Sequence, residues 1–342
     1  MKPIEVGSIN AGPVAFVGNA GYIVSGDDNK IRRWQVNDGK EVREPMDAGF
    51  QVYSIVASRD GKWIVGGMES GRVVVWNAES REKVSKFKGH SKAVYAVDIS
   101  PDARKIASGS DDRTVRVWSR SSGEELLGPW RHDYDVAAVK FSPDGRFIAT
   151  AMWERDSVRV YDSHDGRLLF DSSIRVGSAR NQSLAWVSDS KQLFALSRDG
   201  KVHCLDVPTG QILSAWDIHS NDNASCIALA RNGIFIAAST KSSVSLWDTA
   251  THKQIGPLIH HPDVVRSMAT SANDDLVISG GSKIIMRKLP DILPSSFFEN
   301  AGVFRCQRNP IHHDPPQQMH VVCRMFTEGC LEETIELFRM QE

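Results

Sequence analysis

Thiol and imidazole side chains, the groups in this sequence best suited to chemistry, gather near its C-terminal end. Six of them lie within 25 positions of one another: Cys306, His312, His313, His320, Cys323 and Cys330. Thiolate and imidazole are the ligands that zinc prefers, but zinc sites usually contain cysteines separated by two to four residues, and no such pair is present. Cys323 and Cys330 are seven positions apart, which would place both on one face of a helix, where apolar packing accounts for them equally well. We therefore expect no metal here.

Two acidic turns, Asp27-Asp28 and Asp111-Asp112, raise the question of calcium, which binds hard oxygen ligands. A calcium ion takes about six to eight oxygen ligands, so one pair of carboxylates supplies too few. We expect both turns to have a structural role, and we expect no cofactor.

Local motifs of the common hydrolases and metal enzymes are missing from the sequence. It contains no serine nucleophile elbow, phosphate-binding glycine loop, zinc-protease helix motif or EF-hand loop. We assign no catalytic residue and expect a non-catalytic protein. An enzyme that gathers its residues from distant segments is the alternative, and it would require converging Asp, Glu or His side chains in a central pocket.

Charge and hydropathy narrow the class of partner. The 41 Lys and Arg residues are balanced by 42 Asp and Glu residues, which disfavours nucleic acid or anionic lipid as the main partner. No apolar run approaches the ~18 residues of a membrane helix, the first residues lack a signal-peptide core, and the five cysteines suggest no disulfide framework. We expect a soluble cytoplasmic protein, with the nucleus as the other compartment, and neither a membrane nor a small-molecule substrate as partner.

A short turn motif recurs through most of the chain. Its clearest copy, Ser142-Pro143-Asp144-Gly145-Arg146, lies between two apolar runs, and related turns occur on both sides of it. Aligned on the glycine, the copies fall at positions 20, 61, 103, 145, 190, 233 and 274. The spacing of 41 to 45 residues indicates a repeat architecture with seven copies.

Each copy has the pattern of four short strands. In the third copy, runs of β-branched and apolar residues at 94–99, 105–110, 114–118 and 125–127 are separated by turns rich in Gly, Asp and Ser. A single four-stranded sheet cannot cover both of its own faces, so the copies must pack against one another around an axis. The sequence therefore predicts an all-β fold, a seven-bladed β-propeller.

Three segments of the third copy carry a family resemblance: Gly89-His90, Ser108-Gly109-Ser110-Asp111-Asp112 and Val115-Arg116-Val117-Trp118. They resemble a WD40 repeat, and the resemblance extends over about residues 3–293. It implies a hydrogen-bonded structural network within blade three, formed by His90, Ser108, Asp112 and Trp118. Pro-containing connections between copies, such as Gly128-Pro129-Trp130, are similar to those of WD40 arrays in filamentous fungi.

Domain boundaries follow from where the repeat ends. We expect a propeller over 1–293, a linker over 294–319 and an amphipathic helical tail over 320–342. The seventh copy lacks a fourth strand, and the family's usual closure implies that residues 3–9 supply it. A sensor-like array that belongs to a larger multidomain protein is an alternative for the chain as a whole.

The resemblance also implies where partners bind. In WD40 propellers, partners commonly contact the top face, which is formed by the loops that enter the innermost strands and by the turns between second and third strands. Carried over, these positions are Tyr53, Glu69, Tyr95, Asp111, Asp135, Trp153, Arg155, Arg198 and Arg266. Trp153 lies in a turn with one extra residue, so it is either an exposed anchor or a packed side chain. We predict a scaffold for protein or peptide partners; the alternative is a nuclear propeller associated with histone tails or nucleic acid.

Overall fold

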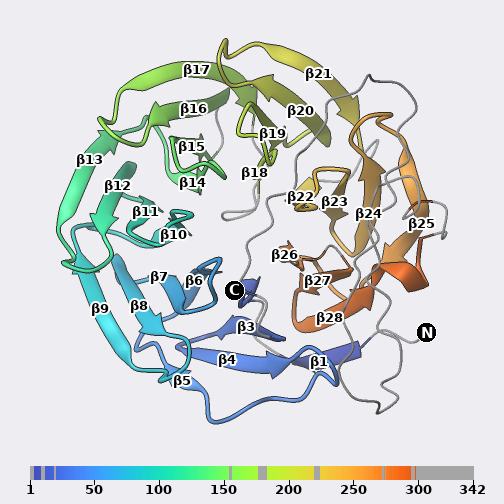
Figure 1. The fold of residues 1–342 in the computed structure, drawn as a ribbon, viewed down its shortest axis with the longest axis horizontal. Helices are drawn as coiled ribbons and strands as arrows, with labels where there is room; N and C mark the ends of the chain where they lie inside the picture. The colour runs from blue at the N-terminus through green and yellow to red at the C-terminus, as the bar shows by residue number, and fades with distance from the viewer. Residues whose placement is uncertain are drawn as a thin grey trace, which may run out of the picture. The chain divides into compact units, whose positions relative to one another are not determined.

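Seven four-stranded antiparallel sheets stand around an axis in the described part of the chain (Figure 1). The computed structural model describes residues 4–8, 12–18, 21–153, 156–175, 183–218, 224–271, 273, 275–293 and 297. All of them belong to one compact unit, Met1–Gly302. The predicted seven-bladed propeller is confirmed. The predicted helix over 320–342, and all of the predicted linker except residue 297, lie outside the described residues.

Blades one to four follow the chain in order, each running from the innermost to the outermost strand. Blade one consists of β2 (Val14–Phe16), β3 (Tyr22–Asp27), β4 (Lys30–Gln35) and β5 (Met46–Asp47). Blade two consists of β6 (Val52–Ala57), β7 (Trp63–Met68), β8 (Arg72–Asn77) and β9 (Lys83–Lys88). Blade three consists of β10 (Val94–Ile99), β11 (Lys105–Ser110), β12 (Thr114–Ser119) and β13 (Glu125–Arg131). Blade four consists of β14 (Val136–Phe141), β15 (Phe147–Met152), β16 (Asp156–Asp162) and β17 (Leu168–Arg175).

The last blade is the one whose strands are not consecutive in sequence. Blade five consists of β18 (Leu184–Trp186), β19 (Gln192–Leu196), β20 (Lys201–Asp206) and β21 (Ile212–Asp217). Blade six consists of β22 (Ala224–Leu229), β23 (Phe235–Thr240), β24 (Ser243–Asp248) and β25 (Gln254–His260). Blade seven consists of β26 (Ser267–Thr270), β27 (Leu276–Gly280), β28 (Lys283–Lys288) and, from the N-terminal end, β1 (Ile4–Ser8).

A short 3-10 helix, η1 (Leu289–Asp291), follows the last strand of blade seven. Across the described ranges, no helix has the length and apolar character needed to cross a membrane.

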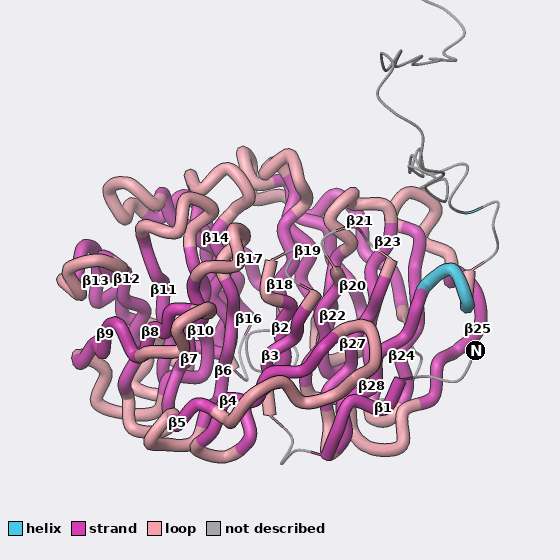
Figure 2. Tube along the Cα trace, turned by 60° about the horizontal axis from the view of Figure 1, so that its bottom comes forward, coloured by secondary structure: helices cyan, strands magenta, loops and turns pink. Residues whose placement is uncertain are grey.

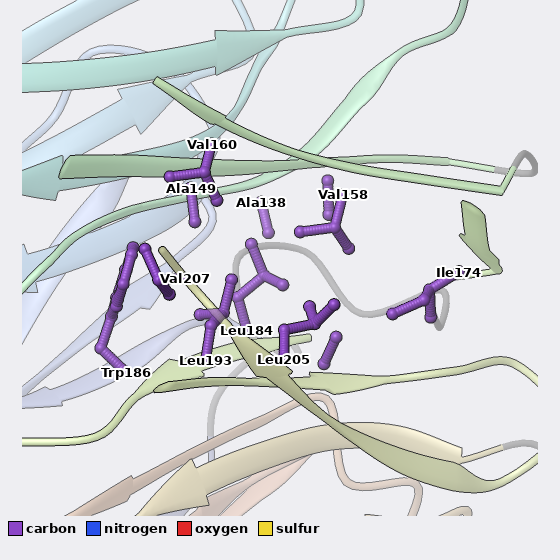
Figure 3. Packing of buried hydrophobic residues seen from close by; sticks show 12 residues of the cluster. Ala138, Ala149, Val158, Val160, Ile174, Leu184, Trp186, Leu193, Leu205 and Val207 are labelled. Atoms are coloured by element: carbon purple, nitrogen blue, oxygen red, sulfur yellow. The ribbon is translucent and has the colours of Figure 1, made fainter. Parts of the chain in front are cut away.

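Apolar side chains from neighbouring blades form the core. Between blades four and five, Val158 and Val160 of β16 share a cluster with Leu193 of β19 and Leu205 of β20 (Figure 3). All four side chains are buried. Because each sheet has a neighbour on both sides, its middle strands are buried on both faces, which is why β15 and β19 are almost continuously apolar.

Glycines on the second strands let neighbouring blades approach closely. A Cβ on Gly67 would lie 2.8 Å from Val94 Cγ1 of blade three, and one on Gly109 would lie 2.8 Å from Val139 Cγ2 of blade four. Such contacts are closer than packed carbon atoms tolerate, so a side chain larger than hydrogen does not fit there without displacing the next blade.

The recurring turn motif connects first and second strands, and side-chain hydrogen bonds explain its sequence. In blade three, Asp102 Oδ1 accepts from the Ser100 hydroxyl at 2.6 Å and from the Arg104 backbone N–H at 3.0 Å. The residue between them, Ala103, has φ 55°, a conformation that favours glycine, and Gly145 stands at the equivalent position of blade four with φ 75°. The motif is therefore a structural turn. Figure 2 shows loops and turns at the ends of the strands.

Candidate functional site

Four side chains of blade three form a continuous hydrogen-bonded network. The Trp118 indole N–H donates to Ser108 Oγ at 2.8 Å, and Ser108 Oγ lies 2.7 Å from His90 Nε2. His90 Nδ1 lies 3.0 Å from Asp112 Oδ2. An ionised Asp112 can only accept hydrogen bonds, so the neutral His90 ring donates one from Nδ1 and accepts one from the Ser108 hydroxyl at Nε2. These are the residues that the WD40 resemblance implied, and the network links the loop before β10 to β11, β12 and the turn between them.

Electrostatics favour the ionised form of Asp112. Burial acts to raise the pKa of this carboxyl group, but hydrogen bonds from His90 and Thr114 outweigh burial and hold the pKa well below its usual range. The backbone N–H of Ser91 also donates to Asp112 Oδ2, at 2.9 Å.

The order Ser108, His90, Asp112 matches the connectivity of a hydrolase triad. Nucleophilic catalysis needs a serine oxygen that substrate can reach, and Ser108 is 0% exposed. Its oxygen also accepts a hydrogen bond from the Trp118 indole N–H, a contact that stabilises the blade. We therefore assign a structural role to the network and not a catalytic one.

Blade four contains a partial copy of this network, which was not predicted from the sequence. His132 Nε2 lies 3.0 Å from Thr150 Oγ1, and the Tyr161 hydroxyl lies 3.5 Å from the same nitrogen. Burial lowers the pKa of His132 to about 4, so this imidazole is neutral at pH 7. The signal was present in the sequence: His132 and Thr150 follow His90 and Ser108 by 42 positions each.

Three aromatic side chains from adjacent blades form a row on the top face. The Tyr53 and Tyr95 rings are 5.5 Å apart between centroids, and the Tyr95 and Trp153 rings are also 5.5 Å apart, in an edge-to-face arrangement. All three side chains are half-buried. We call Tyr53, Tyr95 and Trp153 the aromatic row.

β-Bulges and the repeat register position the row. Strand pairing shifts between Val52 and Ser54 in blade two and between Val94 and Ala96 in blade three, so each tyrosine is the extra residue of a bulge. A bulge re-aims its side chain out of the regular alternation of the strand. In blade four the bulged residue is Ala137, which is buried and small, and Trp153, directly after β15, supplies the aromatic ring.

The backbone fixes Trp153 beside an acidic pair. Its N–H donates to the Asp135 carbonyl at 2.8 Å, and Asp111 N–H donates to the Ala93 carbonyl at 3.0 Å in the equivalent position of blade three. Burial, together with a hydrogen bond and charge repulsion from Asp111, raises the pKa of Asp135. Lys92 Nζ lies 3.6 Å from Asp111, and Arg113 Nε lies 3.9 Å from Asp135.

The other predicted top-face residues are not part of this group. Glu69 is exposed in the turn after β7, and its N–H donates to the Gln51 carbonyl at 2.9 Å. Arg198 and Arg266 are exposed on blades five and seven, away from the three blades that form the row. Arg155 lies outside the described residues.

Metal chemistry has no site in the described residues: no group of three or more His, Cys, Asp or Glu side chains there is placed to hold an ion. The cysteine and histidine residues of the C-terminal segment lie outside that part of the chain. The two described cysteines, Cys204 and Cys226, are buried free thiols, and burial raises the pKa of Cys204 to about 11 and that of Cys226 to about 12. Neither thiol is activated as a nucleophile.

Residues 51–287 match the family model of the IFT122 first beta-propeller, which covers well over half of the chain. The chain belongs to the IFT122 first beta-propeller family. The match runs from the start of blade two into β28, the last strand in the sequence, and together with the seven sheets it confirms the predicted WD40-type propeller. It does not bear on the fungal character of the Pro-containing connections, which stays a prediction. Among curated proteins, none matches this sequence.

Proposed function

We propose that this propeller is a non-catalytic interaction scaffold that binds a protein or peptide partner through the aromatic row. The observation that supports this is the continuity of Tyr53, Tyr95 and Trp153 across three blades. Aromatic residues contribute large contact areas with few rotatable bonds, and they are enriched among the residues that dominate interface energetics.

Rigidity of the support strengthens the proposal. Each tyrosine is held on an innermost strand, and the backbone N–H of Trp153 is hydrogen-bonded to the Asp135 carbonyl in the loop before β14. A preorganised surface loses little conformational entropy on binding, so more of the contact energy contributes to affinity. Membership of a family of propellers agrees with a scaffold role. The cytoplasm, with the nucleus as alternative, stays a prediction for its location.

Quantitative affinity purification tests this proposal, with wild-type protein compared against Tyr95→Ala/Trp153→Ala. We expect specific partners to be depleted by the double substitution, because it removes two of the three rings of the row. Trp63→Ala is a matched control, since Trp63 is also half-buried but lies under Arg120, 4.0 Å from its ring centroid, at the start of β7.

Thermal unfolding of each variant separates a binding role from a packing role. The proposal requires partner loss in Tyr95→Ala/Trp153→Ala with a melting temperature no lower than that of Trp63→Ala. Unchanged partners, or partner loss that simply follows a large drop in melting temperature, would contradict it.

A further inference from the structure

The acidic pair at the end of the aromatic row suggests the chemistry of the partner. Asp111 and Asp135 come from neighbouring blades, and the segments that contain them meet: the His132 N–H donates to the Arg113 carbonyl at 2.8 Å, and Arg113 Nε lies 3.9 Å from Asp135. Repulsion from Asp111 also raises the pKa of Asp135. Two carboxyl groups that repel each other are stabilised by a cation between or beside them. Both are partly accessible, with 27% and 35% of the side-chain surface exposed.

Among the residues that the structure describes, the cations nearest this pair compensate it only weakly. Lys92 and Arg113 approach the carboxylates at 3.6 and 3.9 Å, near the outer limit of an ion pair. Their side chains are 57% and 59% exposed, and exposed pairs of this kind contribute little because water and salt screen them. An incoming cation can therefore displace them at little cost.

Two aromatic residues lie next to the loop that contains Asp135. Trp153 shares a backbone hydrogen bond with Asp135, and the Tyr95 ring packs against Trp153. A lysine ammonium or arginine guanidinium group gains both from carboxylates and from the faces of Trp and Tyr rings. The two features lie side by side at the junction of blades three and four, although they come from different loops.

We propose that the junction of blades three and four binds a lysine or arginine side chain of a partner peptide, with Asp111 and Asp135 facing the cation and Tyr95 and Trp153 packing along its stem. This inference rests on the proposed function and adds the charge of the anchoring residue to it. The methylene stem of either side chain suits the aromatic faces, and its charged head suits the carboxylates.

Selection from a phage-displayed library of random 12-residue peptides against the full chain tests the inference. We expect enriched peptides to share a Lys or Arg at one position. A synthetic copy of the best peptide, labelled with fluorescein, should lose roughly tenfold or more in affinity by fluorescence anisotropy when that residue is replaced by Gln.

Variants of the protein locate the binding site. Asp111→Asn/Asp135→Asn should weaken the same peptide by roughly tenfold, because the amides keep the shape of the carboxyl groups but lose the charge. Asp133→Asn is the matched control: it removes an exposed charge from the same loop, where Asp133 pairs with Arg159 at 3.4 Å, and it should leave the affinity unchanged.

Each contrary outcome has its own meaning. Enriched peptides without a fixed cation that still require Trp153 would overturn this inference and leave the proposed function standing. Peptides whose binding survives both Trp153→Ala and Tyr95→Ala would overturn both. Failure to enrich any peptide over an unrelated protein would also overturn the inference.

Discussion

His132 shows how one buried side chain couples the stability of a blade to pH. Its Nδ1 donates to the Trp130 carbonyl, and its Nε2 lies beside the Thr150 and Tyr161 hydroxyls, in a buried site where an imidazolium would lose its hydration. Burial therefore lowers the pKa of His132 to about 4 in the folded state, against about 6.5 in an unfolded chain.

The sign of the pH effect follows from this difference. The unfolded state binds the proton more tightly, so the contribution of His132 is fully present above pH 6.5 and is lost as pH falls towards 4. The free energy of unfolding should drop by about 3 kcal/mol over this window from this residue. In His132→Gln, the difference between melting temperatures at pH 7.5 and pH 5.0 should shrink, whereas His164→Gln, which removes an exposed histidine of the same blade, should keep it. An unaltered difference in His132→Gln would show that its protonation does not limit stability.

Individual residue roles were predictable where the motif was complete. Blade three contains all four network positions, so His90, Ser108, Asp112 and Trp118 could be named from the sequence. In blade four, Tyr161 stands at the Trp118 position and the turn that would contain the aspartate has an extra residue, which hid His132 and Thr150 from a motif-based search. A comparison at the fixed offset of 42 residues would have found both.

At the scale of elements, close approach between neighbouring sheets depends on small residues of the second strands. A Cβ on Gly109 would meet Val136 and, at 2.8 Å, Val139 Cγ2, both buried in blade four. β-Branched side chains have stiff χ1 angles, so neither can rotate away freely. In blade four, the residue equivalent to Gly109 is Ala151, so the space available between neighbouring blades varies around the ring.

Gly109→Ala should destabilise the propeller by about 1–3 kcal/mol through overpacking. Chemical denaturation followed by tryptophan fluorescence measures the change. Val136→Ala removes the nearest methyl groups, so the double variant should be more stable than the sum of the single effects predicts. Additive effects, or a silent Gly109→Ala, would show that blades three and four shift apart without resistance.

The β-bulges of blades two and three could not be predicted from the sequence. The strands of blades two and three were expected from alternation and turn residues, but a bulge is a property of two paired strands. Only the pairing of β6 with β7 and of β10 with β11 shows that Tyr53 and Tyr95 are extra residues. The family resemblance was enough to predict both tyrosines on the top face. Their contact with each other and with Trp153 could not be predicted without the register of the paired strands.

At the scale of the ring, hydrogen bonding and strand length differ between blades. Blade three has the full network, but in blade two Gly66 stands at the Ser108 position, and the buried Trp76 Nε1 has no hydrogen-bond partner in the described part of the chain. Blade one has a two-residue outer strand, β5. Packing between neighbours must compensate for these differences, as in other repeat architectures where each unit relies on the next.

Because the ring is closed, blade one and blade seven also support each other. The outer strand of blade seven is β1, which pairs antiparallel with β28 from Ile4 opposite Met286 to Ser8 opposite Lys283. Innermost strands close the ring as well, since the Val14 N–H of blade one donates to Ser267 Oγ of blade seven at 3.1 Å. The first blade and the last are therefore joined both through the strand that the chain's beginning contributes and through direct packing.

Removal of residues 1–8 should open the ring at blade seven. β28 would become an edge strand with unpaired backbone groups, and such an edge favours pairing with other chains. We expect a lower melting temperature and concentration-dependent oligomers by light scattering, while a variant that lacks only residues 1–3 keeps all of β1 and should remain like wild type. Far-UV circular dichroism should still show β structure in the longer deletion, because six sheets retain all their strands. A deletion of residues 1–8 that melts and sediments like wild type would show that direct packing between blades one and seven closes the ring without the β1–β28 pairing.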